Sequence, residues 1–198
     1  MGPTIDPPGT RDIAQWAAMH GISHQPRPEP SWFRAWEPYD TLISPTCYLN
    51  SCSWPAHPGT VVLAEPWPAE DDDEPMQRTI LAFATHPGLR LRAAMRVGEH
   101  FITRVMFLEN APPPIVKLGD AAWDEAVVTR AATPDEAARA FHPELRALLQ
   151  RARFRGHLEL RPGGAVIHLA DRVPSAACYA DMARIVPQIV TTALRYPR

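Results

Sequence analysis

The sequence has a single lysine, Lys117, only three cysteines, and no apolar run of the length that crosses a membrane. A membrane helix needs about 20 apolar residues, so we expect no membrane segment. The start, MGPTIDPPGTRD, also lacks the basic and apolar parts of a secretory signal, and we expect a cytoplasmic protein. Three cysteines cannot all pair within one chain, so Cys47, Cys52 and Cys178 are expected to be buried thiols.

The chain also lacks a large net charge. Its 20 basic and 22 acidic residues give a formal net charge of −2. We therefore do not expect a nucleic-acid partner, and any basic patch has to be argued locally. The near absence of lysine indicates a GC-rich genome rather than a need for bidentate arginine contacts.

Proline is abundant, with 23 residues, more than half of them before residue 76. The length of 198 residues and the hydrophobic share of 45% are typical of one compact domain. The stiff segment NAPPPI, 110–115, is the best candidate for a boundary. We therefore expect two parts, a proline-rich part at 1–110 and a second part at 111–198, most simply within one domain.

The first part favours one helix followed by strands. TRDIAQWAAMHG predicts a helix capped by Thr10 and ended by Gly21. Strand-like runs separated by proline, glycine or acidic turns lie at 41–50, 60–65, 78–85, 89–96 and 101–109. The acidic run AEDDDEP, 69–75, is expected to be an exposed, mobile loop, with cation binding or nucleic-acid mimicry as alternatives.

The second part predicts a strand, a helix, a hairpin and a helix. A strand is expected at 126–130, and Thr133 to Glu136 form a capping-box pattern with Pro134 at the first helical position. Pro143 should interrupt that helix. RFRGHLELRPGGAVIHLA is a hairpin by alternation, and a last helix is expected at 175–196, bent at Pro187. The order indicates an α+β fold with an antiparallel sheet and helices packed on one face.

The stretch GDAAWDEAVVTR, 119–130, places Asp120, Asp124 and Glu125 close together. We interpret it as a turn that anchors Trp123 in the core. A carboxylate metal site is the alternative, but no histidine or further oxygen ligand lies nearby in sequence. We therefore expect no metal here.

This stretch, together with AFHPELRALL, resembles a widespread group of small, functionally uncharacterised bacterial proteins. In that group a G-D-x-x-[FW]-D turn precedes a V-V-x-R-like strand and a helix ending near L-x-P-E-L-R. AQWAAMHGISHQP is similar to the opening of the same group. The chain departs from the pattern at Phe141 and His142, where a leucine is expected before the proline. The resemblance implies an architecture and brings no activity or catalytic residues.

Catalytic motifs are missing from the sequence. Cys47, Cys52 and His57 are possible zinc ligands, but their spacing does not match a compact zinc knuckle. No nucleophile elbow, glycine-rich phosphate loop or dinucleotide fingerprint is present, so we expect no cofactor and leave enzyme activity open. A hydrolase or transferase site assembled across the sheet from dispersed residues is one alternative function.

Two arginine stripes form a candidate anion-binding sheet face. In LRLRAAMR and RARFRGHLELR, every second residue should project from the same face of a strand. The residues on that face are Arg90, Arg92, Arg153, Arg155 and His157, with Arg161 beyond them. An RNA- or nucleotide-binding module using these stripes is a second alternative function. We favour a solvated outer face for them, because acids such as Glu159 lie nearby and no aromatic residues interleave.

An aromatic segment near the N-terminus is the other candidate. It contains Trp32, Phe33, Arg34, Trp36 and Tyr39. These rings either fasten a proline-rich segment to the domain or form a partner-binding patch. The missing catalytic motifs and this patch together favour a non-catalytic accessory or regulatory protein that binds another protein.

Overall fold

The described residues form one antiparallel sheet of nine strands. The computed structural model describes residues 6–38, 45–67, 78–98, 112–170 and 172–195. In the sheet the strands follow the order β1-β2-β3-β4-β9-β8-β5-β7-β6. Their bounds are β1 Ser23–Gln25, β2 Cys47–Ala56, β3 Gly59–Trp67, β4 Leu81–Thr85, β5 Ala93–Val97, β6 Ile115–Val116, β7 Val127–Ala131, β8 Gly156–Arg161 and β9 Gly164–Leu169.

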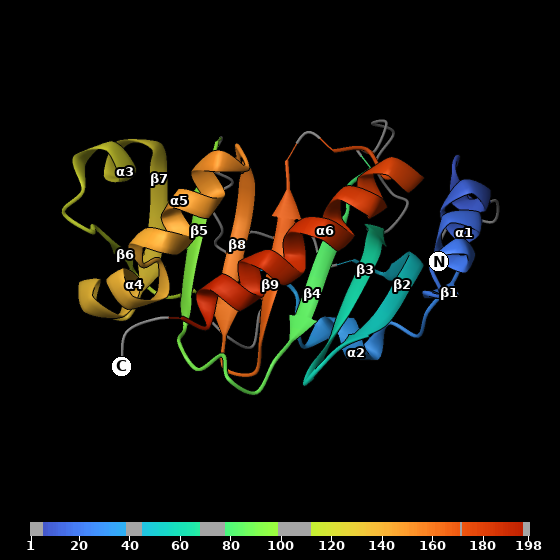
Figure 1. Ribbon diagram of the computed structural model, residues 1–198, viewed down its shortest axis with the longest axis horizontal. Helices are drawn as coiled ribbons and strands as arrows, with labels where there is room; N and C mark the ends of the chain where they lie inside the picture. The colour runs from blue at the N-terminus through green and yellow to red at the C-terminus, as the bar shows by residue number, and fades with distance from the viewer. Residues whose placement is uncertain (1–5, 39–44, 68–77, 99–111, 171, 196–198) are drawn as a thin grey trace.

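The helices are distributed unequally over the two faces of the sheet. They are α1 Thr10–Met19, α2 Ser31–Arg34, α3 Ala121–Ala126, α4 Pro134–Ala140, α5 Pro143–Arg151 and α6 Ala176–Ala193. In Figure 1, α4, α5 and α6 lie in front of the sheet, α1 lies beside β1 at one end, and the short α2 lies behind. The predicted α+β class is confirmed, with α2 on the second face as a feature that the sequence did not indicate.

Strands from both predicted parts alternate in this sheet. β5, from the first part, lies between β8 and β7 of the second. β4 of the first part pairs with β9, for example Phe83 with Val166. The two parts therefore share one sheet and one main hydrophobic core.

Capping residues explain where several helices begin. Thr133 accepts a hydrogen bond from the Glu136 backbone at 3.1 Å, Pro134 is the first residue of α4, and Pro143 starts α5, as predicted. α6 begins after Ser175 and continues through Pro187. The predicted cap of α1 is wrong: Gly9 is the N-cap, and Thr10 is the first helical residue, with its hydroxyl donating to the Pro7 oxygen.

Several predicted strands start later than the sequence indicates; the run predicted at 78–85, for example, becomes a strand at Leu81. The 89–96 run enters the sheet only at Ala93, because the Leu89 backbone bonds to His86 and Gly163 in a turn. β2 begins at Cys47, and residues 41–44 of the run predicted at 41–50 lie outside the described residues. The predicted strand at 101–109, the acidic run at 69–75 and the start of the 110–115 connector lie outside the described residues.

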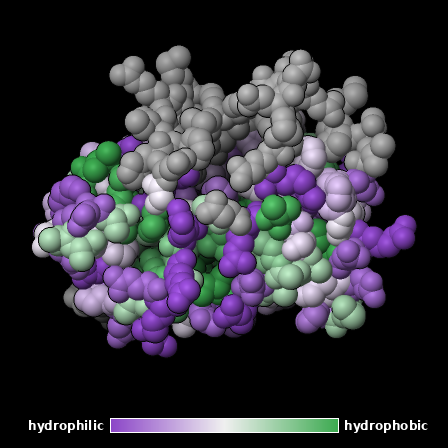
Figure 2. Space-filling model, turned by 90° about the horizontal axis from the view of Figure 1, so that it is seen from above, coloured by the Kyte–Doolittle hydropathy of each residue, from purple (hydrophilic) through white to green (hydrophobic). Residues whose placement is uncertain are grey.

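Two hydrophobic clusters lie on opposite faces of the sheet. The larger, between sheet and helices, includes the fully buried Ile13, Leu63, Met95, Leu145 and Ile167. The smaller includes Phe33, Tyr48, Phe83 and Val166 under α2. Seen from above, hydrophilic side chains flank a hydrophobic area near the middle of the described surface (Figure 2). No helix in the described part of the chain is both long and apolar enough to cross a bilayer.

Candidate functional site

The aromatic segment is fastened to the sheet through Phe33. Its ring stacks on Tyr48 with centroids 4.2 Å apart and meets Phe83 edge-on at 5.4 Å. Phe33 is buried, and burial raises the pKa of the Tyr48 hydroxyl far above its ordinary range. The packing role therefore accounts for Phe33, which has no surface to offer a partner.

Trp32 and Arg34 are the exposed members of the predicted partner-binding set. Trp32 is 40% exposed although its ring touches Phe33, Trp36 and Phe83. Arg34 is exposed, Trp36 is half-buried, and Tyr39 lies outside the described residues. Partner binding by this segment stays a prediction, narrowed to a surface centred on Trp32 and Arg34.

Two features of the β8–β9 hairpin hold this segment in place. A side chain at Gly164 would meet the Trp36 ring at 2.6 Å, so the glycine makes room for the indole. Arg161 donates hydrogen bonds to the backbone oxygens of Ala35 and Glu37. Nothing in the sequence indicated this contact between Gly164 and Trp36, which lie far apart along the chain.

A buried carboxylate lies next to Arg161, the residue that binds the end of the aromatic segment. Glu159 is fully buried and is hydrogen-bonded to His157 and Arg161, its neighbours on the same face of β8. His157 is also buried. The favoured expectation of a solvated outer face therefore does not hold here, because the residues pair with one another out of water.

The structure divides the predicted arginine stripes. Arg90 and Arg92 precede β5, and the Arg92 backbone donates to Glu136 at 3.1 Å. Arg153, in a left-handed conformation at φ 48°, and Arg155 precede β8. The five predicted residues therefore do not form one sheet face, and only Arg153 and Arg155 come together with further arginines.

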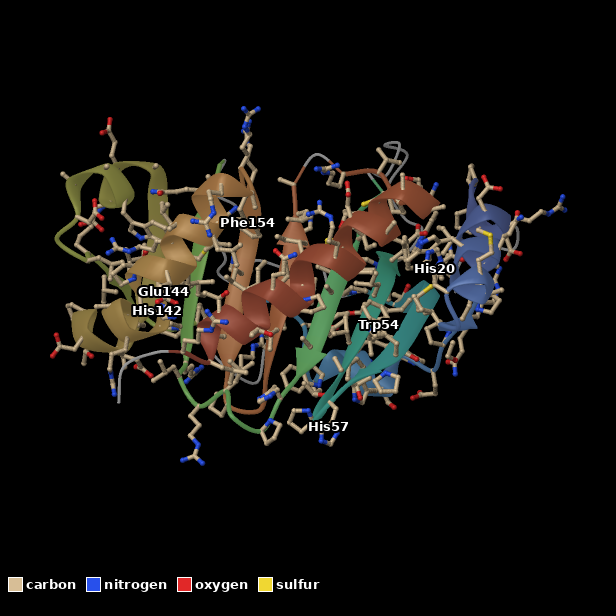
Figure 3. The ribbon with its side chains drawn as sticks, in the orientation of Figure 1. His20, Trp54, His57, His142, Glu144 and Phe154 are labelled. Atoms are coloured by element: carbon tan, nitrogen blue, oxygen red, sulfur yellow. The ribbon has the colours of Figure 1, made fainter. Side chains whose placement is uncertain are left out.

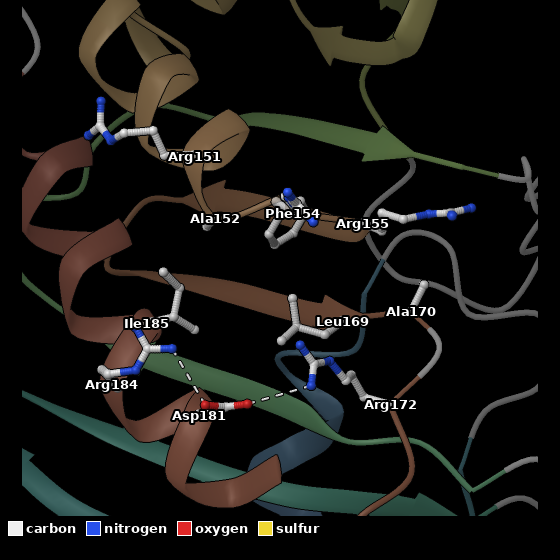
Figure 4. A pocket seen from close by; sticks show the side chains of 11 residues that line it. Arg151, Ala152, Phe154, Arg155, Leu169, Ala170, Arg172, Asp181, Arg184 and Ile185 are labelled. Carbon is white, nitrogen blue, oxygen red and sulfur yellow. Dashed lines mark hydrogen bonds and ion pairs between the residues drawn. The ribbon is translucent and has the colours of Figure 1, made fainter. Parts of the chain in front are cut away.

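Arg153 and Arg155 line a pocket of about 450 Å³ (Figure 4). It lies between the end of α5, the segment that leads into β8, the end of β9 and α6. Among the described residues its lining contains five arginines, one carboxylate and a set of apolar residues: Arg151, Arg153, Arg155, Arg172 and Arg184; Asp181; and Ala152, Phe154, Leu169, Ala170 and Ile185. The sequence reasoning missed Arg151, Arg172 and Arg184, because they are on other elements.

Asp181 holds two of these arginines. One carboxylate oxygen lies 3.5 Å from Arg172 Nη1, and the other lies 3.4 Å from Arg184 Nη2. All three side chains remain substantially exposed. Figure 4 shows the two guanidinium groups on either side of Asp181, with Leu169 and Ile185 next to them. The arrangement suits an anion with an apolar part.

Glu65 and Tyr179, whose pKa values burial raises, belong to a network that joins several elements. Glu65 accepts hydrogen bonds from Asn50 (2.7 Å) and Arg78 (2.8 Å), and Arg78 also donates to the Pro8 oxygen. Burial raises the pKa of the Glu65 carboxyl, although these hydrogen bonds act in the opposite direction. Tyr179 donates to the Asn50 oxygen at 2.8 Å. This network links β2, β3 and α6.

Three of the histidines, His20, His57 and His142, lie apart from one another in the structure (Figure 3). His20 and His57 are exposed and His142 is buried, and Figure 3 shows His142 far from the other two. Cys52 and Cys178 are buried thiols, as predicted, whereas Cys47 is half-buried. Within the described residues no three His, Cys, Asp or Glu side chains come together as metal ligands would.

The acidic stretch anchors Trp123 in the core, as predicted, and it also caps a short helix that the sequence did not indicate. Asp120 caps α3 by accepting from the Trp123 backbone at 3.2 Å, and Asp124 accepts from the backbone of Leu118 and Gly119. Trp123 is buried. The strand begins one residue later than expected, at Val127, because residues 121–126 form a short helix after the Asp120 cap.

Comparison with known proteins finds a solved structure with a similar fold. No protein-family model matches the chain, and no curated protein matches it in sequence. Among solved structures it is similar to the mycobacterial trehalose monomycolate transport factor A, TtfA, with a TM-score of 0.68 and 13% identity. The match covers 95% of this chain and 96% of that chain. At this identity the likeness shows the fold alone, and the resemblance to the uncharacterised bacterial group stays a prediction.

Proposed function

We propose that this protein is a non-catalytic accessory protein that acts by binding another protein through the exposed Trp32 and Arg34. The observation that carries the proposal is an exposed tryptophan on a backbone that the protein holds rigidly. Trp32 is 40% exposed, while Phe33, beside it, is locked into the second core. Tryptophan and arginine are the residues most often found at the energetic centre of protein interfaces.

The surroundings of α2 reduce the entropy that binding would cost. Arg161 fixes the backbone at Ala35 and Glu37, and Trp36 packs over Gly164. A side chain held in place before binding loses little freedom when a partner arrives. The surface is therefore preorganised.

The whole-chain likeness to a protein named as a transport factor supports an accessory role. The proposal does not depend on the cargo named for that protein.

Native mass spectrometry of the tagged protein, purified gently from its own host, tests the proposal. We expect a species heavier than the single chain that dissociates to a second polypeptide. Trp32→Ala with Arg34→Gln should remove that species. Trp36 is unsuitable as a test position, because its ring packs against Gly164 and its truncation would loosen the fold.

Met19→Ala is the matched control, because Met19 is 70% exposed on α1. It should leave the complex intact. A heavier species that survives the Trp32 and Arg34 changes would show that the partner binds elsewhere. A monomer from the unmodified chain would overturn stable protein binding altogether.

A further inference from the structure

The arginine-lined pocket concentrates positive charge on a protein whose formal net charge is negative. Five arginines and one carboxylate are present in its described lining, while the chain carries −2 overall. Like charges placed together repel one another. Asp181 offsets part of this repulsion, and a bound anion would offset more.

The pocket is a product of the tertiary structure rather than of one basic run. Its arginines come from the end of α5, from the segment before β8, from the segment after β9 and from α6. The ion pairs of Asp181 with Arg172 and Arg184, at 3.5 and 3.4 Å, are long for charge-assisted hydrogen bonds. These two guanidinium groups are held near one another and still have N–H donors to offer.

The lining also provides an apolar surface. Leu169 and Ile185 lie beside Arg172 and Arg184, and the Phe154 ring lies across from them (Figure 4). A volume of about 450 Å³ is in the range of small-molecule sites. The ligand should therefore have an anionic group and a compact apolar group.

We propose that this pocket binds an organic phosphate, with the phosphoryl group on Arg172 and Arg184 and the apolar substituent on Leu169, Ile185 and Phe154. The planar guanidinium fork matches phosphate oxygens in bidentate geometry. Such a phosphate can belong to a soluble phosphomonoester or to a phospholipid headgroup. The site is separate from the Trp32 surface and does not depend on it.

Isothermal titration calorimetry with phenyl phosphate tests the soluble form. We expect saturable binding that weakens as salt is added, and weaker binding of inorganic phosphate, which cannot use the apolar side chains. Arg172→Gln with Arg184→Gln should raise the Kd about tenfold or more, because hydrogen bonds to charged groups are lost. Leu169→Ala should weaken the binding of phenyl phosphate and leave the binding of inorganic phosphate unchanged.

Arg11→Gln with Arg139→Gln is the matched control, since it removes the same charge from exposed positions on α1 and α4. It should leave the Kd within about twofold, because charges beyond a Debye length are screened. Vesicles of phosphatidylcholine containing phosphatidic acid test the lipid form, against phosphatidylcholine alone. The site would be assigned to a lipid headgroup if the unmodified protein binds the acidic vesicles but not phenyl phosphate, and if the Arg172 and Arg184 variant loses the vesicle binding.

Three results would overturn the proposal. The first is the absence of binding to both phenyl phosphate and the acidic vesicles. The second is an unchanged Kd in the Arg172 and Arg184 variant, or an equal loss in the control. The third is equal affinity for inorganic phosphate and phenyl phosphate, which would show that the apolar side chains take no part.

Discussion

Arg161 Nη1, on β8, donates a hydrogen bond of 3.3 Å to the backbone oxygen of Ala35, a residue 126 positions earlier in the chain. The same guanidinium donates through Nε to Glu159 at 2.8 Å. One side chain therefore joins a buried carboxylate to the end of the aromatic segment. The partner surface that we propose depends on a contact made from the other part of the chain.

Arg161→Met should destabilise the protein by about 3 kcal/mol, because it removes one partner of a buried carboxylate. Glu159 is fully buried, so water cannot solvate its carboxylate in place of the lost Arg161 guanidinium. Urea unfolding followed by circular dichroism measures the change. Arg139→Met, at an exposed position of α4, should stay within about 0.5 kcal/mol of the unmodified protein. Equal stabilities of the two variants would show that the contacts of Arg161 do not stabilise the fold.

Trp123→Ala should cost about 4 kcal/mol, in the range for a truncated core aromatic. The indole packs on Phe141 with centroids 6.1 Å apart, donates to Thr129 Oγ1 at 2.9 Å, and lies beneath the Arg146 guanidinium. Trp123→Phe retains most of the packing and should cost clearly less. Equal losses in the two variants, measured by urea unfolding, would assign the effect to the indole hydrogen bond instead.

Local signals in the sequence were sufficient for several elements. Thr133, Pro134 and Pro143 mark helix starts through contacts within a few residues, so the sequence pattern contains the whole cause. The class of the fold followed from the order of such elements. Strand starts were less accurate, because the end of the turn before β5 depends on a backbone bond from Gly163 to Leu89.

The candidate sites could be predicted only in part. Alternation in the sequence identified Arg153 and Arg155, but Arg172 and Arg184 reach the same pocket from other parts of the chain. A pattern on one segment cannot reveal residues that only the fold brings near. For the same reason, Phe33 could not be distinguished from Trp32 until α2 was seen against the sheet.

Thr133→Ala should destabilise the protein by about 1 kcal/mol, the usual loss for an N-cap. Its hydroxyl oxygen satisfies the Glu136 backbone N–H at the start of α4. Thr133→Ser keeps that oxygen and should restore nearly all of the stability, as measured by thermal unfolding. A serine variant as unstable as the alanine variant would show that the threonine methyl group, and not the cap, matters.

The Cys52 thiol should make stability fall at alkaline pH. Cys52 is fully buried between sheet and helices, and burial, together with the nearby Glu65 carboxylate, raises its pKa to about 12. In the unfolded chain the thiol ionises near its ordinary value, about 9. The unfolded state alone loses this proton between these two values, so unfolding becomes easier as pH rises through that window.

Across that window the Cys52 contribution is up to about 1.4 kcal/mol for each pH unit. Cys52→Ala should therefore show a shallower loss of stability above pH 9 than the unmodified protein, whatever its stability at neutral pH. Urea unfolding at a series of alkaline pH values measures the slope for both. Tyr48, Tyr179 and Cys178, whose pKa values burial also raises, remain in the variant and contribute to its residual slope. Parallel slopes would show that Cys52 ionises as readily in the folded protein as in the unfolded chain.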